Sequence, residues 1–79
     1  MSVGIADVKI GQKAKVVGYQ NTPAGRSYRQ KLLAMGLTKG VDLTVVRVAP
    51  MGDPIEIRLR GFALSLRKEE AAALQLELL

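Results

Sequence analysis

The side chains that most often perform covalent catalysis are missing from this sequence. It contains no Cys and no His, so it lacks both a thiolate nucleophile and the imidazole that commonly activates a serine. Hydroxyl groups remain on Ser2, Ser27, Ser65 and three threonines, but no spacing in the chain places a base beside one of them. The P-loop pattern G-x-x-x-x-G-K-[ST] is also absent. We therefore predict no catalytic residues and no enzymatic activity.

The same composition argues against a resident metal or cofactor. Zinc and haem sites usually take His or Cys as ligands, whereas calcium and magnesium need several oxygen ligands held close together. The seven acidic residues are scattered along the chain, and three methionines supply only thioethers, which prefer soft metals. We expect no metal ligands and no cofactor.

Charge is distributed unevenly over the 79 residues. The chain carries a net charge of +5, yet residues 1–41 hold seven basic side chains and a single acid, Asp7, and so carry +6. A basic surface of this kind suits an acidic protein, an anionic lipid or a nucleic acid, and it can also serve solubility alone. The length predicts one domain, residues 1–79.

The N-terminal sequence MSVGIADVKIGQ lacks the basic and apolar segments of a secretory signal. No apolar run approaches the ~20 residues that span a bilayer. We expect a cytoplasmic protein.

One segment has the pattern of an amphipathic helix. Thr22 can cap its start, Pro23 suits the first helical position, and the periodicity continues over residues 24–35. The apolar stripe consists of Tyr28, Leu32 and Met35. Basic side chains lie off that stripe, at Arg26, Arg29 and Lys31.

The remaining periodicity is that of short strands. Apolar and polar residues alternate over residues 12–19, 42–49, 55–60, 62–66 and 74–78, with one or two helical turns over 67–73. Ile5, Val8 and Ile10 are expected to cover one edge of the core. About five strands with turn punctuation predict a mainly β fold, a small SH3-like barrel with one helix between strands 1 and 2 and a short helical turn before the last strand.

Glycines and prolines mark the turns of this barrel. We expect positive φ or cap geometry at Gly36, Gly40, Gly52 and Gly61. Pro50 and Pro54 should stiffen the turn between strands 2 and 3, and Asp53 should close it through nearby backbone N–H groups. These residues are predicted to shape the fold.

Three segments of the chain form one ordered set of motifs. They are the helix end YRQKLLAMGLTKG (residues 28–40), the strand and turn VVRVAPMGDPI (45–55) and LSLRK (64–68). In residues and spacing these segments resemble the FeoA family. The family pattern is Leu-x-x-hydrophobic-Gly-hydrophobic-x-x-Gly, followed by an Ala-Pro-x-Gly-Asp-Pro turn, and the match covers roughly residues 12–78. The resemblance implies an SH3-like domain. It also implies an accessory protein of ferrous iron uptake that acts on FeoB, a membrane transporter with a GTP-binding domain. Such a protein would meet the membrane only through this partner.

Candidate partner contacts are basic or apolar side chains. For two of them the alternative is structural, since the helical spacing of Met35 favours the core and Leu37 can supply the hydrophobic contact of the helix end. They are the basic helix residues Arg26, Arg29 and Lys31, together with Met35, Leu37, Arg47 and Met51. An apolar outer face at Leu43 and Val45 would offer a self-contact or a partner site. The main alternative function is nucleic-acid binding or transcriptional regulation, which the basic first half favours. The sparse aromatics (Tyr19, Tyr28 and Phe62) count against base stacking and against an aromatic-lined groove for PxxP peptides.

Overall fold

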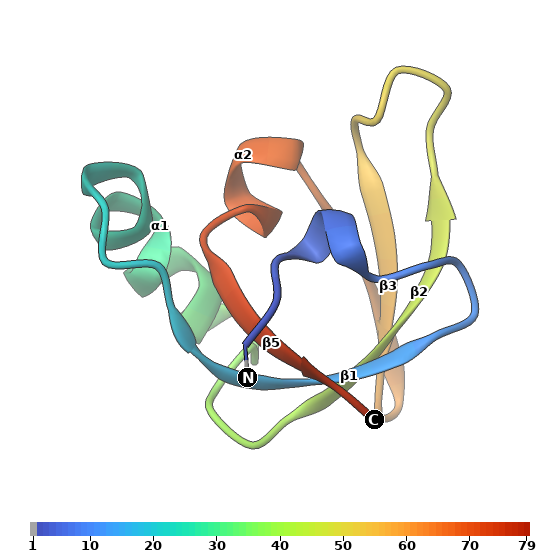
Figure 1. The fold of residues 1–79 in the computed structure, drawn as a ribbon, viewed down its shortest axis with the longest axis horizontal. Helices are drawn as coiled ribbons and strands as arrows, with labels where there is room; N and C mark the ends of the chain where they lie inside the picture. The colour runs from blue at the N-terminus through green and yellow to red at the C-terminus, as the bar shows by residue number, and fades with distance from the viewer. Residues whose placement is uncertain (1) are drawn as a thin grey trace.

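The computed structural model describes residues 2–79 and contains a strongly curved five-stranded antiparallel sheet (Figure 1). The strands lie in the order β4-β3-β2-β1-β5. The elements in chain order are η1 (Ile5–Asp7), β1 (Lys13–Tyr19), α1 (Pro23–Ala34), β2 (Asp42–Val48), β3 (Ile55–Leu59), β4 (Phe62–Leu66), α2 (Lys68–Ala71) and β5 (Leu74–Leu78). The predicted mainly β architecture, with one helix after β1 and a short one before β5, is confirmed.

The core lies inside the curve of the sheet, and alternate residues of each strand fill it. Ala14 and Val16 of β1 are fully buried, as are Ile57 of β3 and Leu76 of β5. Every paired strand is antiparallel, and such a sheet can bury one face while the other remains in water. Burial of these side chains stabilises the register of the strands, because a shift by one residue would expose them to water.

The predicted apolar outer face on β2 is wrong. Leu43 and Val45 are each only 1% exposed, and the pairing of Leu43 with Ala14 of β1 directs both side chains into the core. Thr44 and Val46 occupy the outer face instead. Both faces of β2 contain apolar residues, so only the register with β1 decides which face is buried.

The N-terminal segment covers β5. Val3 forms an isolated antiparallel bridge with Leu76, in which Val3 N donates to Leu76 O at 2.6 Å and Leu76 N donates to Val3 O at 2.8 Å. Ile5 and Val8 then enter the core as predicted, but Ile10 is 63% exposed. The prediction for Ile10 is wrong because the chain turns after Val8 to reach β1, and Ile10 and Gly11 lie on the outside of that turn.

Local signals place α1 against the end of β1. The Thr22 Oγ1 atom accepts a hydrogen bond from Gly25 N at 3.0 Å, which satisfies one of the free N–H groups of the first turn. Leu32 is fully buried and Tyr28 and Met35 are half-buried. After the helix, Gly36 has a φ of +94°, a conformation that an L side chain rarely adopts. The chain can thus reverse so that Leu37 N donates to Leu32 O at 3.0 Å.

Candidate partner-binding surface

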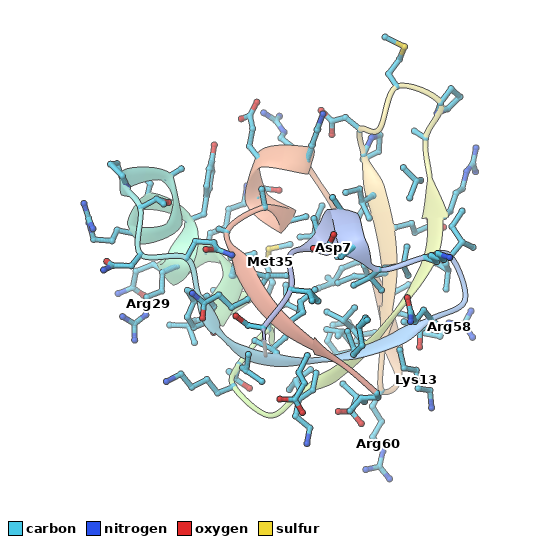
Figure 2. The ribbon with its side chains drawn as sticks, viewed as in Figure 1. Asp7, Lys13, Arg29, Met35, Arg58 and Arg60 are labelled. Atoms are coloured by element: carbon cyan, nitrogen blue, oxygen red, sulfur yellow. The ribbon has the colours of Figure 1, made fainter. Side chains whose placement is uncertain are left out.

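Arg26 and Arg29 form an open basic face on α1, one helical turn apart. Both side chains are exposed, and Figure 2 shows Arg29 pointing away from the body of the molecule. They line a hollow of about 360 Å³ at the junction of β1 and α1, together with Lys39 and the uncharged Tyr19, Asn21 and Gln75 among others. No carboxylate lines this hollow, so it presents positive charge to any anionic group that approaches it.

Tyr19 fixes the position of this basic face. Its hydroxyl donates to the carbonyl oxygen of Leu37 at 2.5 Å, and the guanidinium of Arg29 lies 5.5 Å from its ring centroid. Burial raises the pKa of the Tyr19 hydroxyl, and the positive charge of Arg29 opposes that rise. The ring therefore remains neutral and hydrogen-bonded at physiological pH, and Arg29 rests on it.

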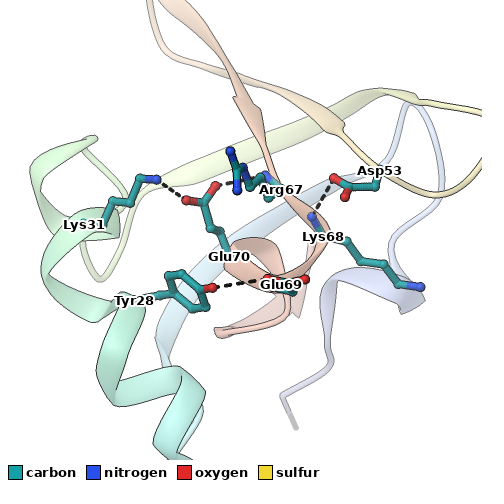
Figure 3. Close-up of polar contacts among 7 residues, drawn as sticks. All are labelled: Tyr28, Lys31, Asp53, Arg67, Lys68, Glu69 and Glu70. Atoms are coloured by element: carbon teal, nitrogen blue, oxygen red, sulfur yellow. Dashed lines mark hydrogen bonds and ion pairs between the residues drawn. The ribbon is translucent and has the colours of Figure 1, made fainter.

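Lys31 is turned away from Arg26 and Arg29 and is paired with α2. Its Nζ atom forms an ion pair with Glu70 Oε2 (Figure 3). Glu70 is only 3% exposed, and its other oxygen accepts from Arg67 N at 2.9 Å. The hydrogen bond from Lys31 and the one from the Arg67 backbone lower the pKa of Glu70. Lys31 therefore does not share an open face with the other two cations, and its charge is largely compensated.

Two further contacts tie α2 to its surroundings (Figure 3). Tyr28 Oη donates to Glu69 Oε2 at 3.3 Å, which is a second link between α1 and α2. Asp53 Oδ1 accepts from Lys68 N at 3.0 Å. The prediction that Asp53 bonds within its own turn is wrong: it caps a helix start 15 residues further along the chain. The cause is spatial, since the β2–β3 turn lies beside the start of α2.

The other predicted contact residues fall in different places. Met51 is 87% exposed at the β2–β3 turn, and Arg47 is exposed on β2. Met35 is half-buried against the core. Leu37 is fully buried, so its prediction as a contact residue is wrong; it seals the end of α1, and no partner can reach it in this structure.

These exposed residues do not form one continuous patch. Figure 1 shows α1 and the β2–β3 turn, which carries Met51, on different sides of the molecule. Any partner that contacts both must therefore wrap around the domain or approach it with two separate segments.

A second basic cluster was not predicted. Lys13, Arg58 and Arg60 line a hollow of about 410 Å³ on the outer face of the sheet, together with Asp42 and Thr44 (Figure 2). The pairings Lys13 with Thr44 and Thr44 with Arg58 bring these cations close although they lie 45 residues apart in the chain. The alternation of β3 identifies Arg58 as outward-facing, but the cluster itself depends on cross-strand register, which the sequence does not reveal.

Two negative findings apply to residues 2–79. In that range, no group of three or more Asp, Glu, His or Cys side chains lies close enough together to bind a metal ion. Over the same residues, no helix has the length and apolar character needed to pass through a bilayer.

Comparison with known proteins identifies the family. The model of the FeoA domain family matches residues 3–78. The chain belongs to the FeoA domain family. A relative in Porphyromonas gingivalis, the Fe(2+) transport protein A/Fe(2+) transporter FeoB fusion protein, is 34% identical over 76 residues. That alignment covers 95% of this chain but 8% of the fusion protein, so the chain spans a small fraction of that relative.

Solved structures of FeoA proteins have the same fold. The FeoA-like protein of Clostridium acetobutylicum is 41% identical, with a TM-score of 0.86, 99% of this chain covered and 87% of that one. The Stenotrophomonas maltophilia FeoA, described as a prokaryotic SH3 domain protein, is 22% identical with a TM-score of 0.76, and the match covers 98% of this chain and 89% of that one. The second likeness concerns the fold alone. The predicted SH3-like barrel is thereby confirmed.

Proposed function

We propose that this protein is a cytoplasmic accessory of ferrous iron uptake and that it acts by binding the cytoplasmic region of an FeoB transporter. The observation that carries the proposal is family membership combined with a relative in which the same domain is fused to FeoB. Covalent fusion keeps two domains close together, at a high effective concentration. A protein that binds FeoB as a separate chain would bring the same two domains together without fusion.

The contact surface follows from charge and exposure. The open cations Arg26 and Arg29, with Lys39 beside them, suit an acidic surface on the transporter. Arg47 and the exposed Met51 are further candidates, since a methionine adapts readily to an apolar partner surface. Iron itself is transporter cargo in this proposal, and the domain contributes by contact, without catalysis.

Nucleic-acid binding receives less support. The basic residues of the first half are divided between α1 and the sheet, and Lys31 is paired with Glu70. Low-salt binding to duplex DNA is nevertheless a simple control, because phosphate binding would weaken steeply with added salt.

A binding titration tests the proposal. Detergent-solubilised full-length FeoB from the same organism would be titrated with the wild-type chain and with the double variant Arg26→Glu/Arg29→Glu. We expect saturable binding that the double variant weakens by about tenfold or more, because two favourable charge pairs become repulsive.

The matched control is Lys9→Glu, which reverses an exposed cation outside the α1 hollow. Its affinity should stay within about twofold of wild type. Absence of saturable wild-type binding, combined with normal iron uptake after deletion of the gene, contradicts the proposed function.

A further inference from the structure

The outer strand β4 lacks the protection usual at a sheet edge. It is last in the strand order, and within residues 2–79 β3 is its only strand neighbour. Its sequence, FALSL, contains neither charge nor proline, and its register with β3 runs without a bulge from Ile55–Leu66 to Leu59–Phe62. Natural proteins usually block such edges with charges, prolines, bulges or a covering segment, since a bare edge pairs readily with another strand.

The free backbone groups of β4 can be assigned from the register. Leu59 pairs with Phe62 across the two-residue turn Arg60-Gly61, and in such a hairpin the closing pair exchanges both backbone hydrogen bonds. Because these bonds alternate along an antiparallel ladder, Ala63 and Ser65 direct their N–H and C=O groups away from β3. No backbone bond outside the ladder uses either residue within the part of the chain that the structure describes.

The opposite edge of the sheet is covered. Val3 bridges Leu76 of β5 through the two hydrogen bonds given above, and β5 also carries the charged Glu77. The fold therefore blocks one edge and leaves the other free, which makes β4 the side where a strand can be added.

Cations lie near both ends of this free edge, and one cation and one acid lie on its outer face. Arg60 lies at one end of β4, and Arg67 and Lys68 lie at the other. On the outer face, Arg58 stands opposite Ala63 and Glu56 opposite Ser65. Ala63 is small, so the long Arg58 side chain can extend over it toward the position of an added strand. Acidic residues at the ends of that strand or beside Ala63 would meet these cations, whereas an acidic residue beside Ser65 would face Glu56.

Charge also separates two possible occupants. A second copy paired antiparallel through β4 would bring Arg60 of one copy near Arg67 and Lys68 of the other, and like charges across a strand pair are destabilising. A partner segment with an uncharged middle and acidic ends meets no such repulsion.

We propose that β4 accepts an extended, acidic segment of the partner protein as a sixth strand of the sheet, through the free backbone groups of Ala63 and Ser65. Main-chain hydrogen bonds would hold the segment, and the surrounding cations would select for acidic side chains. This inference rests on the proposed function, in that it gives the partner contact a geometry.

The test compares Ala63→Pro with Ala63→Val. Proline removes the outward N–H at an edge position without removing a bond to β3, whereas valine keeps the N–H and suits a strand. Titrated against full-length FeoB, Ala63→Pro should bind about tenfold more weakly or worse, and Ala63→Val should bind like wild type. Equal binding by Ala63→Pro and wild type overturns the inference while leaving the proposed function intact.

A measurement on the wild-type chain tests the inference even if the proline variant does not fold. Amide hydrogen exchange at Ala63 and Ser65 should slow when FeoB is added, because both N–H groups become bonded. Unchanged exchange at both residues in a saturated complex overturns the inference. So does sedimentation showing that the wild-type chain is a dimer which Ala63→Pro makes monomeric, because the second copy would then be the occupant.

A synthetic probe separates the two proposals if FeoB does not bind. It is a blocked seven-residue peptide of alternating valine and threonine with glutamate at each end, compared with the same peptide ending in lysines. Protection of Ala63 and Ser65 by the acidic peptide alone supports strand addition even if the proposed partner is wrong. If neither peptide slows exchange at Ala63 and Ser65 at its highest soluble concentration, or if both peptides slow it equally, strand addition is contradicted.

Discussion

At the scale of the residue, Glu70 is the least exposed charged side chain within residues 2–79. A buried carboxylate is unfavourable unless hydrogen bonds and an opposite charge replace water. Lys31 and the backbone N–H of Arg67 supply both, and they lower the pKa of Glu70. The stabilisation is therefore present above the ordinary carboxyl pKa of 4.5 and is lost as the pH falls through the lowered folded-state value.

Replacement of Glu70 by glutamine tests this account. At pH 7 we expect Glu70→Gln to lower the free energy of unfolding by roughly 1–3 kcal/mol, because the amide keeps the shape but loses the charged pairing with Lys31. Urea denaturation from pH 7 to pH 3 should show the difference from wild type shrinking toward the acid end. Glu69→Gln is the matched control, because Glu69 is exposed and glutamine keeps an oxygen that can accept from Tyr28 Oη. It should change stability by at most about 0.5 kcal/mol. A pH-independent difference would refute the charge explanation.

At the scale of the element, Gly25 decides how closely α1 approaches the end of β1. A Cβ atom added there would lie 2.0 Å from the carbonyl oxygen of Gln20. Backbone atoms cannot move aside cheaply, so α1 would have to shift as a whole.

We expect Gly25→Ala to lower the free energy of unfolding by about 2 kcal/mol or more. Thermal and urea unfolding measure this loss, and displacement of α1 should also shift the NMR resonances of Tyr19 and Arg29. Gly4→Ala is the control, because its added Cβ would meet only Asp7 Oδ2, at 3.9 Å. The control should change stability by no more than about 1 kcal/mol. Similar losses in both variants would show that the crowding at Gln20 is not the cause.

The contact between the β2–β3 turn and α2 gives another prediction at this scale. Asp53→Ala removes the carboxylate that accepts from Lys68 N, and we expect a loss of about 1 kcal/mol, the usual effect of deleting a helix cap. Asp53→Asn keeps an acceptor oxygen and should lose less than half as much. If the two variants are equally destabilised in urea, the hydrogen bond is not what connects the turn to α2.

Much of the element pattern was readable from local signals in the sequence. Thr22, Pro23 and Gly36 delimit the helix to within one residue, since predicted residues 24–35 became Pro23–Ala34. The alternation of apolar and polar residues located the strands, because strands such as β1, β3 and β5 bury one face. Local signals end there. Three features depend on which segments meet in space: the inward-facing side of β2, the burial of Leu37 and the hydrogen bond from Lys68 N to Asp53.

The candidate surface was less predictable than the fold. Arg26 and Arg29 are exposed as expected, but nothing in the sequence marks Lys31 as the partner of Glu70, 39 residues later. The Lys13, Arg58 and Arg60 cluster likewise requires the register of three strands. Surface sites assembled from distant residues carry no periodicity of their own, so a single sequence does not reveal them.

At the scale of the whole molecule, the fold is completed by its last strand. β5 pairs with β1 over five residue pairs, from Ala14–Leu78 to Tyr19–Leu74, and Leu74 and Leu76 are fully buried. We expect deletion of residues 74–79 to abolish cooperative unfolding, because β1 would lose a neighbour and the core would lose two large side chains. Deletion of Leu79 alone, which is 57% exposed, should leave a cooperative transition. Circular dichroism during thermal unfolding separates these outcomes, and a cooperative transition in the longer deletion would contradict this role for β5.

The pairing of β1 with β5 also sets when the chain can fold. Ala14 and Leu78 are neighbours in the sheet but lie 64 residues apart in sequence, and contacts of such long range slow folding because a large loop must close first. During synthesis from the N-terminus, β1 is made before β2 and β5, which are its two neighbours in the sheet. The complete sheet can therefore form only after synthesis of β5, and until β2 and β5 pair with β1 its apolar face lacks both strand neighbours.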